Sequence, residues 1–459
     1  MVSVELKDDS RWSGVREVMN MSWPIVLGSL SFTIMEFTDK WMVSKLGTVP
    51  LAAVGSSSLW SYTLSTIILG IVGCVSTFAA QSLGRNEKEN CARYAWQGLY
   101  LGLFAGLLAL AMWPVAPPLF WSMGHNPETT ELEIIFFKIR LFGYLPMAWG
   151  TALAAFYQAI NRPRVPMYIA IVGTALNALL NYILIFGKCG FPALGVNGSA
   201  TATVISQYFQ AALLHLVFIY APSLKEYATR RVFRFDPARF KELVRIGLPS
   251  GAAMFLDIFN WGIFTSYVVG HFGDVSLAAH NIAISFMHIS FMPAVAVNQG
   301  IAAIVGQWIG KGDVPRAKSR TYTAIKICVV YMAGMGLIFG VFGESLIRNI
   351  FSADPGVVDL GHKLLVLAAF FQAFDAINIT CIGALRGAGD TRWMMIAMFI
   401  GAYAFFLPLA TVLSFPLGGA AYGAWIGATI YICAVSGILF WRFWSERWRH
   451  INIFSEHGK

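Results

Sequence analysis

Long apolar stretches, separated by short polar breaks, recur along the whole of this 459-residue sequence. A helix needs about 20 mainly apolar residues to cross a bilayer, and this template fits about twelve times. The composition agrees, because 57% of the residues are apolar and only 12% are charged, whereas soluble globular proteins carry roughly 25% charged residues. The sequence therefore predicts an all-α polytopic membrane protein with little room for a domain outside the bilayer.

The loops between the predicted spans indicate the topology. The spans are expected at residues 17–44, 50–80, 94–115, 131–159, 166–187, 198–221, 243–270, 276–309, 320–343, 357–385, 391–414 and 418–442. With the N-terminus inside, the basic loop residues gather on the cytoplasmic side, and only Lys45, Lys188, Arg348 and Lys363 lie outside. Because cytoplasmic loops are enriched in Lys and Arg, we expect a multi-pass protein of the cell (inner) membrane with both termini in the cytoplasm.

The two halves of the chain resemble each other on either side of a basic stretch at residues 221–245. Residues 46–53 (LGTVPLAA) recur as 272–279 (FGDVSLAA), about 225 residues further on. Six spans per half make the halves parallel, related by a pseudo-two-fold axis along the membrane normal. We therefore expect two pseudo-symmetric six-helix lobes. The predicted parts are an N-lobe (1–221), a cytoplasmic linker (222–242), a C-lobe (243–442) and a cytoplasmic tail (443–459).

The first predicted span contains Glu36, Asp39 and Lys40, although charges inside a span cost several kcal/mol and rarely face lipid. Glu36 and Lys40 are four residues apart, in the order that favours an ion pair on a helix. An ion pair with Lys40 and a role in a substrate cavity are equally good explanations of Glu36. Asp39 has no obvious partner, which makes it the better candidate for a functional acid.

The fifth and sixth spans offer neutral oxygen ligands that can accompany such an acid. Asn177 and Asn181 lie one turn apart on one helix face, and Thr201 and Thr203 lie in the next span. Beside one carboxylate, these oxygens can coordinate Na⁺ or hold a protonated acid by hydrogen bonds. The alternative is ordinary hydrogen bonding between helices, worth about 0.6–2 kcal/mol per contact, and residue type alone favours it.

The second half carries two further acids. Asp257 precedes Asn260 in the seventh span, while Gln372, Asp375 and Asn378 form a stripe in the tenth. Two carboxylates in apolar helices are too costly to be incidental, so this set is a candidate site for ion or substrate. The acids of the two halves do not fall at equivalent positions of the repeat. Each half is therefore expected to hold its own kind of site.

The eighth span holds another polar stripe, formed by Asn281, Ser285 and His288. Asn281 and His288 are candidates for the substrate cavity. Phe286 is a further candidate, although single aromatic residues in spans more often serve packing. His280 and His288 are more often satisfied structural histidines than proton carriers.

Three motifs carry a resemblance to a known family. They are residues 39–47 (DKWMVSKLG) followed by LAAV at 51–54, residues 194–198 (LGVNG) and residues 384–392 (ALRGAGDTR), of which the last is the most specific. With these motifs, and over essentially its whole length, the chain resembles the multidrug and toxic compound extrusion (MATE) transporters. The resemblance implies two six-helix lobes around a central cavity, and export driven by an inward flux of H⁺ or Na⁺.

The resemblance also assigns roles to single residues. The N-lobe acid of the family and the polar residues grouped with it match Asp39, Asn177, Asn181 and Thr203. Asp257 and Asp375 match the paired C-lobe acids that mark the NorM-like branch of the family. Two departures bear on the coupling ion: Lys40 stands where the family usually has an uncharged residue, and Asp257 stands where a longer Glu is common.

We therefore expect a secondary-active antiporter that exports organic, cationic and amphipathic compounds in exchange for H⁺ or Na⁺. The coupling residues are expected to be Asp39, Asn177, Asn181, Thr203, Asp257 and Asp375. Na⁺ is expected either at Asp257 and Asp375 or at Asp39, Asn177 and Asn181. The candidates for the substrate cavity are Glu36, Asn260, Asn281, Phe286, His288, Gln372 and Asn378. No cofactor besides the coupling ion is expected.

Other functions fit the sequence less well. An exporter of an endogenous metabolite or lipid-linked precursor remains the alternative, although phosphate-bearing cargo needs a cationic cavity. A channel or receptor lacks a filter motif or effector domain, and an enzyme lacks a nucleophile–base pair or metal cluster. The basic residues form no patch interleaved with aromatics, so nucleic acid is not an expected partner. The expected partners are small organic solutes and the bilayer, and the expected state is a monomer.

Overall fold

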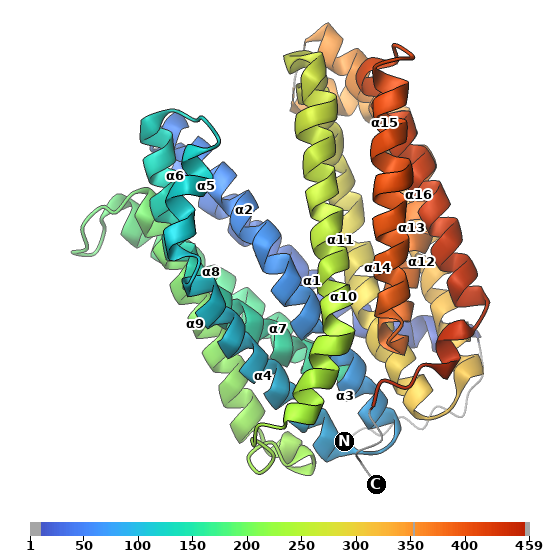
Figure 1. Ribbon diagram of the computed structural model, residues 1–459. Helices are drawn as coiled ribbons and strands as arrows, with labels where there is room; N and C mark the ends of the chain where they lie inside the picture. The colour runs from blue at the N-terminus through green and yellow to red at the C-terminus, as the bar shows by residue number, and fades with distance from the viewer. Residues whose placement is uncertain (1–10, 352–353, 455–459) are drawn as a thin grey trace. The chain divides into compact units, whose positions relative to one another are not determined.

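The computed structural model describes residues 11–351 and 354–454, which contain helices and no strands (Figure 1). The α-helices are α1 (Arg11–Ser44), α2 (Thr48–Gly73), α3 (Val75–Gly84), α4 (Lys88–Leu110), α5 (Ala116–Trp121), α6 (Pro127–Leu141), α7 (Tyr144–Ala159), α8 (Arg164–Phe186), α9 (Val196–Tyr220), α10 (Pro237–Ile263), α11 (Asp274–Gly310), α12 (Val314–Ile350), α13 (Pro355–Ala388), α14 (Thr391–Ile400), α15 (Leu407–Ser414) and α16 (Ala420–Trp444). The predicted all-α class is confirmed.

Eleven helical segments within the described residues are long and apolar enough to cross a membrane. They match eleven of the twelve predicted spans. The remaining predicted span, the fourth in chain order (residues 131–159), is divided between α6 and α7 by a tight turn at Phe142 and Gly143. Neither helix alone is long enough to cross a membrane. This break ends α6 just after Arg140.

Contacts between residues divide the chain into two compact units. Unit 1 contains Met1–Val26 and Ala252–Asn452, and unit 2 contains Leu27–Gly251 and Ile453–Lys459. α1 and α10 each begin in one unit and end in the other, and each carries a proline, Pro24 or Pro249, shortly before the division. These units are defined by packing, whereas the predicted lobes are defined by the repeat, and the lobe limits remain a prediction.

Equivalent turns relate the two halves of the chain. After α3 and after α11, the amides of Glu87 and Asp313 each donate a 2.9 Å hydrogen bond to a carbonyl five residues earlier. The residue before each of them, Asn86 (φ 63°) or Gly312 (φ 78°), is left-handed. This is the Schellman arrangement that closes a helix, and it occurs where the sequence repeat predicts it.

Two further pairs of positions fix the register between the halves. Asn161 after α7 and Gly389 after α13 are left-handed and close the same kind of turn. α2 and α11 both follow a glycine with positive φ, Gly47 (122°) and Gly273 (86°). The second half holds one more residue between Pro249 and Gly273 than the first half holds between Pro24 and Gly47. The π-helical segment η3 (Phe264–Val269) gives room for an inserted residue of this kind.

The linker between the halves packs against α4 in unit 2. The indole N–H of Trp96 donates to the carbonyl of Thr229 (2.8 Å). Lys88, at the start of α4, forms an ion pair with Glu226, and its ammonium group lowers the pKa of that carboxyl. These contacts hold the predicted linker against the helices of unit 2.

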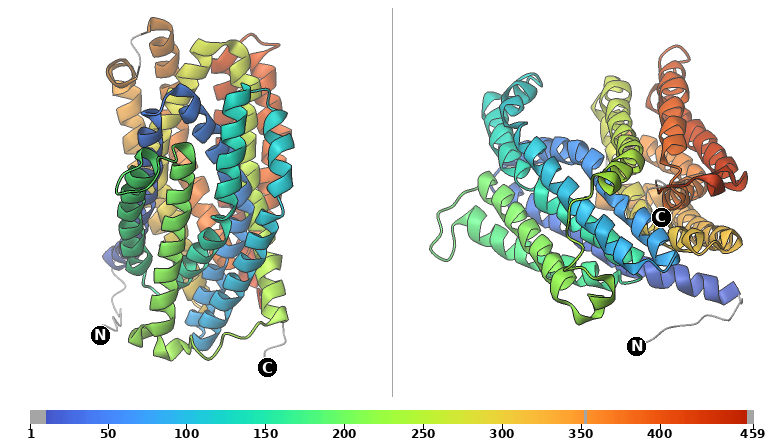
Figure 2. Two further views of the ribbon diagram at one scale, coloured as in Figure 1. Left: turned by 90° about the vertical axis from the view of Figure 1, so that its left-hand side faces the viewer. Right: turned by 60° about the horizontal axis from the view of Figure 1, so that its bottom comes forward.

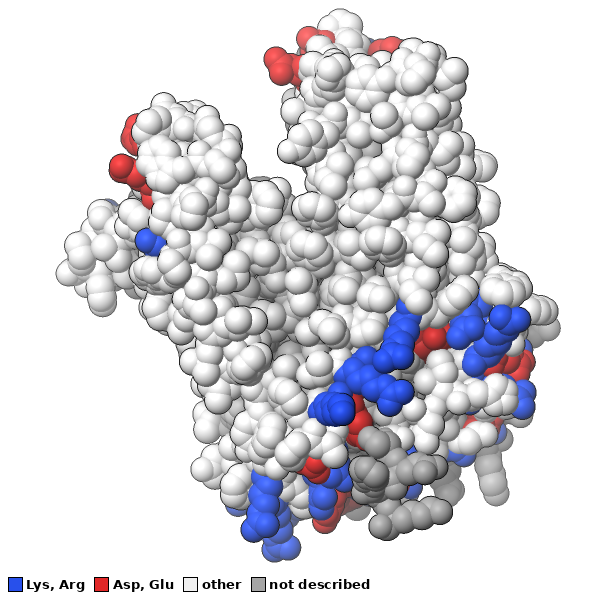
Figure 3. Space-filling view, in the orientation of Figure 1, with Lys and Arg blue, Asp and Glu red and all other residues white. Residues whose placement is uncertain are grey.

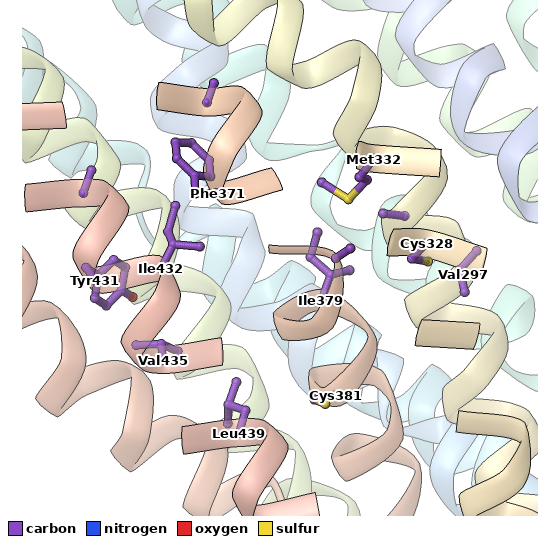
Figure 4. Packing of buried hydrophobic residues seen from close by; sticks show 14 of the residues in the cluster. Val297, Cys328, Met332, Phe371, Ile379, Cys381, Tyr431, Ile432, Val435 and Leu439 are labelled. Carbon is purple, nitrogen blue, oxygen red and sulfur yellow. The ribbon is translucent and has the colours of Figure 1, made fainter. Parts of the chain in front are cut away.

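The core of unit 1 is formed mainly by α11, α12, α13 and α16. Figure 4 shows Phe371 and Ile379 of α13 between Met332 of α12 and Ile432 of α16. Such an interior is dry and closely packed. A polar side chain that enters it needs a partner there, because an unpaired buried polar group is costly.

Unit 2 is built from α2 to α9 together with the end of α1 and the start of α10. α8 and α9 run side by side, and α9 also packs against α6 and α7 (Figures 1 and 2). In each unit, the Lys and Arg side chains visible in Figure 3 gather toward one end of the helices. Most of the remaining visible surface carries no charge, as expected for helices in contact with lipid.

Candidate functional site

Asp39 of α1 lies buried in unit 2 and accepts hydrogen bonds from two neighbouring helices. Thr203 Oγ1 of α9 lies 3.0 Å from Asp39 Oδ2, and the side-chain amide of Asn181 of α8 donates to Asp39 Oδ1. The same amide lies 3.0 Å from Oδ1 of Asn177, one turn earlier. Asn177 and Asn181 are fully buried, and Asp39 is 9% exposed. The structure thus brings these four predicted residues into one hydrogen-bond network.

Thr203 gives this network two possible states. Its single hydroxyl proton has two acceptors at 3.0 Å, Asp39 Oδ2 and the carbonyl oxygen of Ser199. A hydroxyl donates one hydrogen bond and can accept others. Thr203 can therefore donate to an ionised Asp39, or accept from a protonated Asp39 while it donates to Ser199. In addition, Oδ1 of Asn181 has no hydrogen-bond partner and offers a free oxygen beside the carboxylate.

The other polar residues near Asp39 do not behave as expected. Glu36 and Lys40 form no ion pair in the described part of the chain, so the pairing that was one of two explanations of Glu36 does not occur there. Lys40 is exposed whereas Asp39 is buried, because adjacent residues point to different sides of a helix. Glu36 is half-buried and lies within electrostatic reach of Asp39. Thr201 donates to a backbone carbonyl of its own helix (2.7 Å).

In unit 1, Asp257 of α10 and Asp375 of α13 lie close enough to interact electrostatically. Asp375 is 9% exposed, and Nδ2 of Asn378 donates to its Oδ1 over 3.3 Å. Asp257 is half-buried and accepts no hydrogen bond from the described residues. Tyr431 of α16 lies within electrostatic reach of both carboxylates. A proton or a cation between the two acids would relieve their mutual repulsion.

Amide side chains one helix turn from each acid carry oxygen atoms without a hydrogen-bond partner. Oδ1 of Asn260 and Oδ1 of Asn378 are buried and have no hydrogen-bond partner. Gln372 Oε1 accepts a hydrogen bond from Ser290 Oγ (2.6 Å), whereas its Nε2 has no partner. Hard cations are bound by carboxylate and carbonyl oxygens. The carboxylates of Asp257 and Asp375 with the amide oxygens of Asn260 and Asn378 are therefore suitable ligands for a small cation as well as for a proton.

The predicted stripe on α11 points elsewhere. Asn281, Ser285 and His288 are exposed on α11, and Ser285 Oγ donates to a carbonyl of its own helix (2.7 Å). Phe286 is 5% exposed and packs in the unit 1 core, on the ring of Phe339 (5.7 Å between centroids) among others. Two buried polar residues of α11 instead form hydrogen bonds with α13, Ser290 with Gln372 and Asn298 with Ile379 and Arg386, and the sequence analysis missed both.

His280 is held in one tautomer by its neighbours in unit 1. The indole N–H of Trp425 can only donate, so Nδ1 of His280 (3.1 Å away) must accept. Nε2 therefore carries the proton and donates to Thr265 Oγ1 (2.8 Å), which donates to the carbonyl of Trp261 (2.8 Å). The ring has no free lone pair left for a further proton. This geometry matches the expected structural role.

Trp425→Phe is expected to lower the free energy of unfolding by about 1–3 kcal/mol, because the Nδ1 acceptor of His280 loses its donor. The ion dependence of transport is expected to stay unchanged. Thermal unfolding in detergent checks the first effect, with Trp441→Phe as the control on an exposed tryptophan of the same helix. Loss of transport with unchanged stability would instead make His280 a proton carrier.

Arg140 is a basic residue that the sequence analysis did not single out. It lies in the last turn of α6, within the predicted span 131–159, and within electrostatic reach of Asp39. The signal was available, because an arginine inside an apolar span marks a functional candidate.

Known proteins resemble this chain over most of its length. The MatE family model matches residues 24–183 and 249–412. The chain is similar to the probable multidrug resistance protein NorM of Mesorhizobium japonicum, with 33% identity over 446 residues that cover 94% of each protein. It is also similar to the multidrug resistance protein NorM of Burkholderia vietnamiensis, with 29% identity and 93% of each covered.

Solved structures share the fold. One is titled as the outward-facing conformation of a multidrug resistance MATE family transporter of the MOP superfamily, with a TM-score of 0.87, 20% identity, and 96% of this chain and 97% of that chain covered. Another is a crystal structure of MATE in complex with MaL6, with a TM-score of 0.86, 20% identity, and 95% and 98% covered. At these identities the similarity bears on the fold alone.

Proposed function

Because this chain is a NorM-like member of the MATE family, we propose that it is a secondary-active multidrug efflux antiporter. It exports organic, cationic and amphipathic compounds in exchange for H⁺ or Na⁺. We further propose that it acts as a monomer in the cell (inner) membrane, with both termini in the cytoplasm. The observation that carries the coupling proposal is the buried network of Asp39, Thr203, Asn181 and Asn177.

In this proposal, Asp39 exchanges a proton without rearrangement of heavy atoms. A proton taken up by Asp39 becomes a hydrogen bond to Thr203, whose own proton turns to the carbonyl of Ser199. Release of the proton reverses both steps. The hydrogen bonds can thus be kept in either state, so that neither state of the buried acid leaves an unpaired group.

The acid pair in unit 1 is proposed as the second cation site. Asp257 and Asp375 bring two negative charges together, and Asn260 and Asn378 add unpartnered amide oxygens. A proton, Na⁺ or a cationic substrate would each neutralise part of this charge. Competition between the ion and the substrate for such charge is one physical basis for exchange.

Coupling requires only that the ion and the substrate prefer different conformations of the protein. If the ion-bound form favours one side of the membrane and the substrate-bound form the other, downhill ion entry drives uphill export. Apart from protonation, no bond is made or broken in this cycle, and the substrate is not chemically changed. The protein contributes selective binding and a conformational change.

Transport by purified protein in phosphatidylcholine proteoliposomes tests the proposal. The probe is the ethyl ester of rhodamine B, a fluorescent cationic dye, and a pH gradient and a Na⁺ gradient are imposed separately. We expect one of the gradients to drive dye movement. If neither gradient moves the dye or other organic cations while the protein stays folded, the proposal fails, and anionic or lipid-linked cargo becomes the better hypothesis.

A further inference from the structure

The residues that follow α16, here called the end segment (445–454), pass from unit 1 to unit 2. Asn452 is the last residue of unit 1, and Ile453 and Phe454 belong to unit 2. The chain also passes between the units inside α1 and inside α10, which are long helices. Residues 451–454, in contrast, form neither helix nor strand. The end segment is thus a connection between the units that is not helical.

Trp448 fixes the first part of the end segment in unit 1. Its side chain is 1% exposed and belongs to the core of that unit. Its ring stacks on the ring of Phe443 of α16 (5.4 Å between centroids, 9° between planes), and its indole N–H donates to the carbonyl of Phe443 (2.8 Å). Ile451 packs against the same core. This part of the segment is therefore a fixed part of unit 1.

An aromatic site in unit 2, here called the clamp (Phe78, Arg85 and Tyr94), holds the last part of the segment. The ring of Phe454 meets the rings of Phe78 of α3 (5.8 Å, 83°) and Tyr94 of α4 (5.9 Å, 64°). The guanidinium group of Arg85 lies over the Phe454 ring, 4.2 Å from its centroid. Ile453 is 3% exposed. Edge-to-face ring pairs and Arg–ring contacts are both attractive, so the clamp favours an aromatic side chain.

The fold of a unit does not require this clamp. Counted from the turn that follows both α3 and α11, the equivalents of Phe78 and Tyr94 in unit 1 are Ile304 and Arg320. Arg320 forms an ion pair with Glu17 (2.6 Å) instead of holding a ring. In the first half of the chain, moreover, the residues after α9 remain in unit 2 as far as α10. The clamp and the segment that it holds are therefore particular to the end of the chain.

The end segment is short enough to restrain the two units. Phe454 lies six residues after Trp448, and an extended chain spans at most about 3.6 Å per residue. While both aromatic residues stay bound, the Trp448 site in unit 1 and the clamp in unit 2 cannot be more than about 22 Å apart. A rearrangement of the units that exceeds this limit requires Phe454 to leave the clamp.

We propose that the end segment is a releasable strap, and that Phe454 leaves the clamp and binds it again in each transport cycle. The bound strap restrains the rearrangement of the two units, and its release permits the rearrangement. This inference rests on the proposed function, because exchange requires a conformational change. A segment that only stabilised the fold would stay bound throughout the cycle.

The reactivity of an Ile453→Cys variant towards N-ethylmaleimide measures release, because a buried thiol reacts only when the segment leaves unit 2. Mass spectrometry of the C-terminal peptide gives the rate. Without a gradient, we expect Phe454→Ala to raise this rate about tenfold or more, and Phe454→Tyr to keep it within about twofold. With Phe454 in place, dye and the coupling gradient together should also raise the rate. Asn452→Cys, at an exposed neighbour, should react at one rate under all conditions.

A reversible crosslink tests whether transport needs the release. Arg85→Cys and Phe454→Cys are combined with Cys189→Ser, which removes an exposed native thiol. A bis-methanethiosulfonate reagent joins the two cysteines, and a reducing agent separates them. We expect the crosslink to slow gradient-driven movement of rhodamine B ethyl ester about tenfold or more, and reduction to restore it. The same crosslink between Asp359→Cys and Lys363→Cys, one turn apart on α13, should have no effect.

Three results would overturn the inference. They are full transport with the strap crosslinked, equal thiol reactivity with and without the Phe454 ring, and reactivity that does not rise during transport. Failure of the proposed function looks different. In that case neither gradient moves the dye even before the crosslink is made, and the strap has no transport cycle in which to act.

Discussion

Asp39→Asn is expected to reduce the gradient-driven component of dye transport by about 5–150-fold, the range of a typical coupling free energy. Asn keeps the shape of the side chain but can neither take up and release a proton at neutral pH nor supply a negative charge to Na⁺. The network with Thr203 and Asn181 can persist around it, so the protein should fold. Initial rates in proteoliposomes, with and without the gradient, measure the effect.

Asp359→Asn is the matched control for this change. Asp359 is an exposed acid of α13 that pairs with Lys363 (2.7 Å), and exposed ion pairs contribute little. The gradient-driven dye transport of the Asp359→Asn variant should equal that of the unaltered protein. If Asp39→Asn also keeps its full response, the coupling ion does not use the unit 2 network, and the unit 1 acids become the coupling site.

Asp257→Asn and Asp375→Asn are expected to be strongly non-additive, because the two carboxylates act on one bound cation. Either single change should cost nearly as much gradient-driven transport as the double change, with an interaction energy of about 0.5–3 kcal/mol. The four proteins of this double-mutant cycle are compared by their initial rates. Effects that simply multiply would show that the two acids serve separate sites.

The same variants should unfold at higher temperature than the unaltered protein. Each change removes one of two neighbouring negative charges from unit 1, which should stabilise the fold by about 0.5–2 kcal/mol while activity falls. Thermal unfolding in detergent measures this shift. Lower stability would indicate that the acids hold the helices together, and their effect on transport would then be indirect.

Much of the fold follows from the sequence, because a membrane span is a local property of about 20 residues. Eleven of the predicted spans match helical segments that are long and apolar enough to cross a membrane. The exception, residues 131–159, is broken at Phe142 and Gly143, and hydropathy does not register a turn of two residues. The repeat was visible because its turns need special residues: Gly47 and Gly273 both adopt positive φ.

The site was harder to predict, because helix periodicity shows which residues share a face but not what that face meets. Asn177 and Asn181 were placed together correctly on α8, and the structure brings them to Asp39. The stripe of Asn281 and Ser285 on α11 has the same spacing, yet it is exposed. Which face of α11 packs against α13 depends on contacts between segments distant in sequence.

Charged residues inside the predicted spans were the most informative feature of the sequence for locating the site. The ion pair considered for Glu36 and Lys40 does not form among the described residues: Glu36 lies within electrostatic reach of Asp39 and Tyr62, whereas Lys40 is exposed. Arg140 received no role, although its charge in an apolar span is as unusual as that of Asp39.

The central claim is an obligatory exchange of ion for substrate, and dye-driven ion movement tests it most directly. Proteoliposomes without any ion gradient are given rhodamine B ethyl ester on one side, and internal pH and Na⁺ are followed by fluorescent indicators. We predict that H⁺ or Na⁺ moves opposite to the dye in a fixed ratio, and that this movement disappears in the variant that loses gradient response. Dye movement without ion movement, or ion movement without dye, would contradict antiport.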